Sequence, residues 1–371
     1  MSLLRRVNIL FYIIIAAGVF SCSNDENIVD NYDRQGLNLY TAEEIIVPSF
    51  ENFSSTTSLL DQSVTTFTGN PTVEGLNTLR ADLKNARMSW QWCAMYNFGP
   101  SLNQGLLSIV NEYLIIESNI EQNILNENFQ LESLAQANAR GFKAMGYLLY
   151  GNGLSDEEII NSFINSPARG QYLKAISSLI LSKASLTTQN WASYIDQYAS
   201  ESRAGTDAGS SLSILINEIN KYWESTTRDK KLGIPLGKRS EGALLPDRTE
   251  AYYAGYSTEL LTENITAYKY LFEGRTKDGV EGQLSLSNYL KELGATDVIE
   301  SNDLAEVMST NFQAAIDQSH IVGDPLKTKV ETNYNACDQL YLLLQKQIIF
   351  MKSDMPSVMG ISISYADNDG D

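Results

Sequence analysis

Histidine and cysteine are scarce in this chain, which has one histidine and three cysteines among 371 residues. The histidine is His320, and beyond the N-terminal region the cysteines are Cys93 and Cys337. Zinc sites use closely spaced thiolate and imidazole ligands, and these residues are too far apart to form one by spacing. No catalytic triad is supported either, because no serine and acid partner can be assigned to His320. We expect His320 at a helix end. Cys93 and Cys337 are expected as free buried thiols, with a disulfide as the alternative.

Basic residues are also few, with 27 lysines and arginines against 45 aspartates and glutamates and a formal net charge of −18. No basic stripe interrupts this acidic background, which excludes nucleic acid as a partner. Phosphate loops and dinucleotide-binding glycine motifs are missing as well. The negative charge leaves attraction of cations or basic partners open, although an acidic surface also serves solubility.

Long apolar runs are missing except for one at the N-terminus, residues 7–20, which follows Arg5 and Arg6. A short basic start and an apolar run too short to span a bilayer are typical of a secretory signal. The run ends in Val-Phe-Ser before Cys22, which resembles a lipobox. We therefore expect residues 1–21 to be a lipoprotein signal peptide and Cys22 to carry the lipid. The alternative is an ordinary signal with an incidental cysteine.

The residues after Cys22 indicate where in the cell the protein is expected. Ser-Asn-Asp-Glu at residues 23–26 is similar to the acidic export tag of surface lipoproteins in Bacteroidetes. The resemblance implies a lipid-anchored protein of the cell envelope, located at the outer membrane. It leaves open whether the protein is exposed at the cell surface. Residues 22–42 are polar and acidic without a helical period, and we expect them to be a flexible tether. The folded domain is expected over residues 43–371.

The pattern of the remaining chain is helical, because apolar residues recur with a period of 3.6 and strand signals are few. Asn70 and Pro71 predict a helix start that leads to about Tyr96. A capping box at residues 155–158 and Ser-Pro at 166–167 predict two more helix starts. Further helices are expected over residues 43–68, 209–227, 250–273, 299–319 and 330–351. The fold class is therefore all-α. Residues 228–247, rich in glycine, proline and charge, predict a linker or long loop between halves at about 43–227 and 248–360.

One segment resembles a family signature. Gly141-Phe-Lys-Ala-Met-Gly146 is similar to the G-x-H-x-x-E pattern of the imelysin-like family, with Lys143 in place of His and Gly146 in place of Glu. Residues 90–100, 231–237 and 354–371 also resemble segments of this family, the last two of its members from Bacteroidetes. The chain is thus identified as an imelysin-like lipoprotein with a degenerate motif, which implies two packed helical bundles that form one compact unit with a cleft between them.

The two substitutions decide the expected chemistry. Histidine and glutamate on one helical face can hold a divalent metal, whereas an ammonium has no lone pair and glycine has no side chain. We therefore expect no catalytic residue, no metal, no cofactor and no enzymatic activity. Where a cleft persists, its expected lining is Tyr147, Tyr252, Tyr253, Tyr256 and Ser257, with Lys143 beside them. Packing of these tyrosines between helices is the alternative.

Three functions remain open from the sequence. The resemblance favours a non-catalytic, ligand-binding envelope lipoprotein linked to metal, iron or haem uptake. Its partners would be the membrane, through the lipid anchor, and an unknown small ligand, peptide or envelope protein. The alternatives are a metal-dependent peptidase that uses other ligands, and a structural surface protein. An oxygen-rich end at residues 367–371 resembles the start of a calcium loop, but it has no closing carboxylate, which favours a solvated tail.

Overall fold

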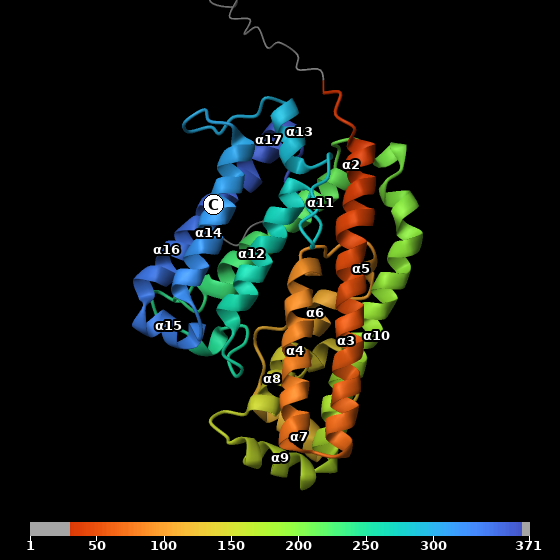
Figure 1. Ribbon diagram of the computed structural model, residues 1–371, viewed down its shortest axis with the longest axis vertical. Helices are drawn as coiled ribbons and strands as arrows, with labels where there is room; N and C mark the ends of the chain where they lie inside the picture. The colour runs from red at the N-terminus through yellow and green to blue at the C-terminus, as the bar shows by residue number, and fades with distance from the viewer. Residues whose placement is uncertain (1–29, 366–371) are drawn as a thin grey trace, which may run out of the picture. The chain divides into compact units, whose positions relative to one another are not determined.

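Helices make up the regular structure of residues 30–365, the part of the chain that the computed structural model describes (Figure 1). These residues contain no strand, and their β-type pairing is limited to two isolated bridges, Arg275 with Glu281 and Thr296 with Asp303. The prediction of an all-α fold is confirmed. The expected signal peptide, Cys22 and the acidic end at residues 367–371 lie outside the described residues. The described chain from Asp33 to Tyr365 belongs to one folded unit. This unit includes a helix at Arg34–Tyr40, inside the segment that was expected to be a flexible tether.

The first half of this unit is built around three long helices. Helix α3 (Val47–Gly69) packs against both α4 (Val73–Cys93) and α10 (Pro167–Tyr198). Shorter elements precede α3 or connect these helices: α2 (Arg34–Tyr40), the π-helix η1 (Thr41–Ile46), α5 (Pro100–Asn103), α6 (Leu106–Val110), α7 (Glu117–Leu125), the 3-10 helix η2 (Leu134–Ala139), α8 (Gly141–Tyr150) and α9 (Asp156–Ile164).

Capping residues set where these helices begin. Ser155 and Glu158 form the expected capping box at the start of α9, and Pro167 begins α10 as predicted. Helix α4 begins at Val73, two residues later than the Asn70–Pro71 pattern predicts. The reason is that Thr72 is extended and its hydroxyl accepts a hydrogen bond from the Gly75 N–H at 3.1 Å. Threonine in this position satisfies a donor that the helix itself leaves free.

Aromatic side chains fill the interior between α3 and α10. Trp191 is fully buried, and its ring stacks on Phe50 at a centroid distance of 6.1 Å. Phe98 and Tyr198 approach the same indole at 5.7 and 5.8 Å. Large rings in offset or edge contacts bury much apolar surface, so this cluster stabilises the first half strongly.

The second half continues through a further set of helices. Helix α14 (Leu304–Val322) packs against both α12 (Ser257–Glu273) and α16 (Tyr334–Ile349). The elements between α10 and α12 are the 3-10 helix η3 (Glu201–Arg203), α11 (Ser211–Tyr222), the π-helix η4 (Trp223–Gly233) and the 3-10 helix η5 (Pro246–Arg248). The remaining elements of the second half are α13 (Leu286–Glu292), α15 (Leu326–Thr332), the π-helix η6 (Phe350–Asp354) and α17 (Met355–Met359). Helix α12 also packs on α4, and this contact joins the two halves (Figure 1).

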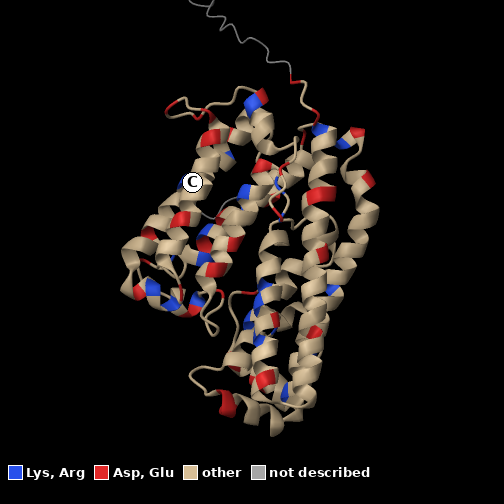
Figure 2. Cartoon of the chain, viewed as in Figure 1, with Lys and Arg blue, Asp and Glu red and all other residues tan. Residues whose placement is uncertain are grey.

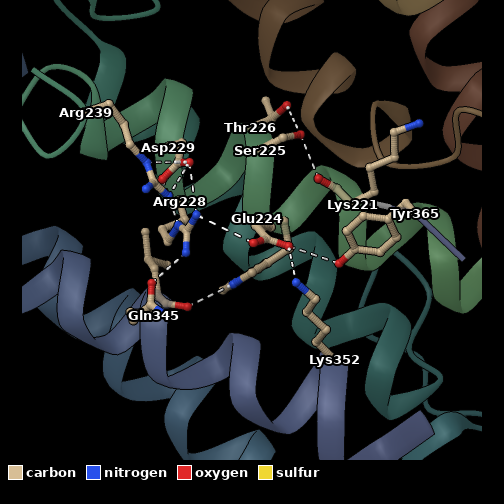
Figure 3. A network of polar contacts seen from close by, with 12 residues as sticks. Lys221, Glu224, Ser225, Thr226, Arg228, Asp229, Arg239, Gln345, Lys352 and Tyr365 are labelled. Atoms are coloured by element: carbon tan, nitrogen blue, oxygen red, sulfur yellow. Dashed lines mark hydrogen bonds and ion pairs between the residues drawn. The ribbon is translucent and has the colours of Figure 1, made fainter. Parts of the chain in front are cut away.

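Residues 228–247 differ from the expected linker in their first part. Here η4 continues α11 as far as Gly233, and Arg228, Lys231 and Leu232 are buried. The Arg228 guanidinium contacts both Asp229 carboxylate oxygens, at 2.8 and 3.0 Å, and Arg239 reaches the same carboxylate at 3.0 Å (Figure 3). Composition suggested an exposed segment because these charges look solvated, but they are paired with one another inside the fold.

The C-terminal segment crosses back over η4 and α11. Both oxygen and nitrogen of the Asn217 side-chain amide bind the backbone of this segment, at Ser364 N–H (2.7 Å) and Ser362 C=O (3.1 Å). The Tyr365 hydroxyl donates to Glu224, which also accepts from Lys352 (Figure 3). The long C-terminal helix expected over residues 330–351 is interrupted at Asn333, which separates α15 from α16.

The scarce residues lie where the sequence placed them. Cys93 and Cys337 are free and buried, which confirms the thiol interpretation over a disulfide. His320 lies in the last turn of α14 and is exposed. No helix among residues 30–365 has both the length and the apolar character that a bilayer span requires.

Candidate ligand site around helix α8

Helix α8 begins at a glycine that the backbone requires. Gly141 has φ +79°, a conformation that side chains disfavour. A Cβ on this residue would lie 2.7 Å from the carbonyl oxygen of Val110 and 3.0 Å from that of Ile109. The C-terminal end of α6 therefore packs directly against the start of α8. This close approach sets the position of the first turn of α8, in which Lys143 lies.

Lys143 is buried, with 4% of its surface exposed, and its ammonium is enclosed by backbone carbonyls. Its Nζ donates to the carbonyl oxygens of Tyr113 and Asp247 at 2.8 Å each and of Thr249 at 3.1 Å. Burial, followed by the nearby Arg87 charge, lowers the pKa of Lys143 to about 7. A neutral amine, however, has only two N–H groups and would turn its lone pair toward the third carbonyl oxygen. The three acceptors therefore fit the protonated form.

Gly146 lies one turn further along α8 and faces a cation. A Cβ built on it would lie 3.8 Å from Nη1 of Arg87 and 3.8 Å from the Tyr253 ring, which is ordinary contact. The glycine is thus not required by lack of space. Arg87 is buried, and its Nη2 donates to the backbone carbonyl of Glu250 at 2.7 Å. Where the family pattern has a carboxylate, this chain has an open side-chain position beside a guanidinium.

A buried ion pair lies behind this position, where α4, η4 and the segment before α12 meet. Nζ of Lys231 lies 2.5 Å from Oε2 of Glu250, and both side chains are almost fully buried. The other carboxylate oxygen accepts from Asn111 at 2.8 Å and from Gln91 at 3.1 Å. Burial acts to raise the pKa of Glu250, but the charges of Lys231 and Arg87 outweigh it and hold that pKa below its usual value.

A polar pocket of about 290 Å³ opens beside Lys143. Its walls come from the segment before α7 and the start of α7, from the first turn of α8 and the turn after that helix, and from η5 and the segment that follows it. Carboxylates and cations are balanced in it, since Glu117 and Asp247 oppose Lys143 and Arg248. The complete lining is Leu114, Ile115, Glu117, Lys143, Asn152, Asp247, Arg248, Tyr252 and Tyr253.

The tyrosines expected to line a cleft divide into two groups. Tyr252 and Tyr253 line the pocket, and the Tyr253 hydroxyl donates to Glu117 at 2.5 Å. Tyr147 stands beside them with its ring centroid 5.5 Å from that of Tyr253, and its hydroxyl donates to Glu121 at 2.8 Å. Burial and then the Glu121 carboxylate raise the pKa of Tyr147 to about 12, so its hydroxyl keeps its proton at neutral pH.

Tyr256 and Ser257 lie deeper than the pocket. Tyr256 is buried against Ala251 and Leu260, and the Ser257 hydroxyl accepts a hydrogen bond from the Ala251 N–H at 2.9 Å. Neither side chain is part of the pocket lining. They position the segment that carries Tyr252 and Tyr253.

The donor set around α8 does not suit a divalent metal. Within residues 30–365, no group of three or more histidine, cysteine, aspartate or glutamate side chains is placed to hold a metal ion. The one carboxylate in the buried cluster, Glu250, is already paired with Lys231, and Lys143 and Arg87 add positive charge. A metal cation in this position would meet two fixed cations and no free ligand, so these residues support no catalytic step through a metal.

Sequence reasoning did not identify the residues of this buried cluster. Gln91 stands between two tryptophans, and Lys231 lies in a segment interpreted as a linker. Polar side chains inside an apolar helical pattern, such as Gln91 and Arg87 in α4, were the available signal. Glu250 carried no signal, because its partners are distant in sequence.

Comparison with known proteins identifies the fold. A family model described as Imelysin matches residues 46–347. An imelysin-like protein from Psychrobacter arcticum 273-4 has a TM-score of 0.71 and 16% identity, with 90% of this chain and 97% of that chain covered. A candidate iron-regulated protein A precursor from Parabacteroides distasonis ATCC 8503 has a TM-score of 0.71 and 13% identity, with coverages of 88% and 95%. A search among curated proteins finds no match. At these identities the structural likeness shows the fold alone.

Proposed function

The chain belongs to the imelysin family, and on that premise we propose that it is a non-catalytic, ligand-binding member held at the cell envelope by a lipid on Cys22. Its role would be linked to the uptake of a metal, iron or haem. The name of the Parabacteroides distasonis relative refers to iron regulation of that protein. The extension to this chain rests on shared family and fold.

The observation that carries the non-catalytic part is the enclosure of Lys143. Its ammonium donates to three carbonyl oxygens at the position where the family pattern has a metal-binding histidine. A lysine so held has no lone pair for a metal, and its charge opposes the approach of a second cation. Gly146 removes the carboxylate of the pattern as well. No side chain is therefore left at this position to hold a metal that could activate a water molecule.

The binding part is supported by the pocket beside Lys143. Its volume of about 290 Å³ is close to the lower end of the range for small-molecule sites. Its lining combines two tyrosines, charged groups of both signs and two aliphatic side chains. Such a mixture can orient a small polar ligand without chemistry. A metal-dependent peptidase and a purely structural protein remain the competing functions, and the next experiment separates them.

Metal content and peptidase activity test the proposal together. We expect the purified, dialysed chain to hold far less than one equivalent of zinc, iron or manganese by plasma mass spectrometry. We also expect no chelator-sensitive cleavage when the chain is incubated with an unstructured protein substrate. The double variant Lys143→His, Gly146→Glu is the matched comparison, because it restores an imidazole and a carboxylate on the same helical face. We expect its metal content to rise.

Stoichiometric transition metal in the unaltered chain, together with cleavage that a chelator stops, would show a peptidase with other ligands. Failure of haem, iron or any other tested small ligand to change the melting temperature, with the chain folded, would favour the structural role.

The envelope location has its own test. The sequence from Arg5 to Cys22 is the basis for it, and those residues lie outside the described part of the chain. We expect the unaltered protein in the membrane fraction of an expressing bacterium and Cys22→Ser in the soluble fraction, because a lipid chain supplies the membrane affinity. Equal distribution of the two forms would contradict lipidation at Cys22.

A further inference from the structure

The second half of the protein contains a groove that the site around α8 does not involve. Its walls are α14, α16 and the loop that precedes α14, and its volume is about 510 Å³. This is within the size range of ligand sites. The lining combines four carboxylates, two amides, one hydroxyl, one lysine and apolar side chains.

One side of the groove is strongly acidic. Glu300, Asp303 and Glu306 are exposed, and within residues 30–365 none of the three takes part in an ion pair. In Figure 2 the loop before α14 carries red acidic segments. Lys346 on α16 is the one cation in the lining, and its ammonium lies over the Phe350 ring at 5.7 Å. The groove therefore has more negative than positive charge.

A second feature is independent of these carboxylates. Asn311 lines the groove although only 6% of it is exposed. Its Nδ2 donates to the Leu343 carbonyl at 3.1 Å and to Gln347 at 2.8 Å, which fixes the orientation of the amide. Its Oδ1 accepts no hydrogen bond from the described residues and is not buried, so this oxygen is an acceptor at the wall of the groove. A hydrogen-bond donor that enters the groove can bind this oxygen.

Apolar surface accompanies these acceptors. Val298 and Ile299, on the loop before α14, are 80% and 74% exposed, and Ile299 lines the groove with Leu343 and the buried Phe350. These side chains give a ligand in the groove apolar surface to contact beside the acceptors. Within residues 30–365 no set of ligands in this groove suits a metal ion, so the acceptors point to an organic cation.

We propose that this groove binds a segment of a partner protein that carries lysine or arginine next to aliphatic residues. A long basic side chain can rest its methylene stem on Ile299 and Phe350 while its head contacts the carboxylates and Oδ1 of Asn311. The net charge of −18 attracts such a segment before contact. This inference is independent of the proposed function, since the groove shares no residue with the pocket beside Lys143.

Fluorescence anisotropy with short labelled peptides tests the groove on the whole folded chain. The probe is a capped heptapeptide of alternating lysine and leucine, and two comparison peptides replace its lysines by glutamate or its leucines by serine. We expect only the lysine–leucine peptide to bind measurably, with an affinity that falls as salt is raised. Equal binding of the glutamate peptide, or of the serine peptide, would overturn the proposal.

Variants locate the binding. The double variant Glu300→Gln, Glu306→Gln should weaken the lysine–leucine peptide by roughly two- to tenfold, since each surface charge pair contributes modestly. Lys346→Met should strengthen it, because the one competing cation is removed. Glu157→Gln, an exposed change on α9, is the control and should have no effect. Circular dichroism verifies that each variant is folded. If the double variant and Lys346→Met both bind as the unaltered chain does, the groove is not the site.

Discussion

Replacement of Glu250 by glutamine is expected to lower the free energy of unfolding by about 3–5 kcal/mol, the usual effect of removing one partner of a buried ion pair. The Glu250 carboxylate is 2.5 Å from the Lys231 ammonium and accepts from Asn111 and Gln91. Glutamine keeps the shape but not the charge. Lys231 and Arg87 would then be buried cations without a counter-charge. Urea unfolding followed by circular dichroism gives the difference directly.

An exposed pair at the same separation provides the control. Lys84 and Glu259 are also 2.5 Å apart, but their side chains are 38% and 48% exposed. Glu259→Gln should therefore change stability by no more than about 1 kcal/mol. Similar losses at the two sites would mean that burial does not control the strength of the Glu250 pair.

The same pair gives stability a defined pH dependence. Because Lys231 and Arg87 hold the pKa of Glu250 below its usual value against the effect of burial, the unfolded chain binds this proton at a higher pH than the folded chain does. The contribution is complete above the unfolded value of about 4.3 and is lost as pH falls through the folded pKa. Glu250→Gln should flatten this part of the stability curve.

Substitution of Gly141 by alanine is expected to destabilise the protein by about 2–5 kcal/mol, the sum of a strained backbone and a steric overlap. The residue has φ +79°, and the new Cβ would lie 2.7 Å from a backbone oxygen of Val110. The chain at Val110 leads within three residues to Tyr113, one of the carbonyls that hold Lys143. Relief of the overlap would shift α8 and weaken that contact.

Gly153→Ala separates the two contributions. Gly153 has φ +82°, and a Cβ there would meet nothing within 4 Å. Gly153→Ala should therefore lower the free energy of unfolding through backbone strain alone, by about 1–2 kcal/mol. Thermal or urea unfolding of both variants should rank Gly141→Ala clearly below Gly153→Ala in stability. If the ranking is equal or reversed, the end of α6 does not pack closely against residue 141.

The helices could be predicted to different degrees, for local reasons. Ser155 and Glu158 lie three residues apart, so their capping box is visible in the sequence and set the start of α9 correctly. The continuation of α11 through η4 was not visible, because Arg228 and Asp229 are typical of exposed segments until their partners Arg239 and Gln345 are known. Interior pairing of this kind depends on residues that the chain brings together only after folding.

The candidate site shows the same division. Lys143 and Gly146 could be located from the spacing of a motif. That neither residue can bind a metal follows from the two side chains alone. Arg87, Lys231 and Glu250 were not found, since no spacing relates three residues on α4, η4 and the segment before α12. Tyr256 could not be separated from Tyr253 by sequence, and only packing shows one in the core and the other at the pocket.

The amino-acid sequence by itself determined the helical class, the imelysin resemblance and the loss of histidine and glutamate at residues 143 and 146. These depend on local periodicity, capping and residue identity. The tertiary structure alone decided that three carbonyls enclose the Lys143 ammonium, that one carboxylate offsets the buried cations, and that an acidic groove lies between α14 and α16. Those features arise from contacts between distant segments, where burial strengthens each charge interaction and no local pattern records the partner.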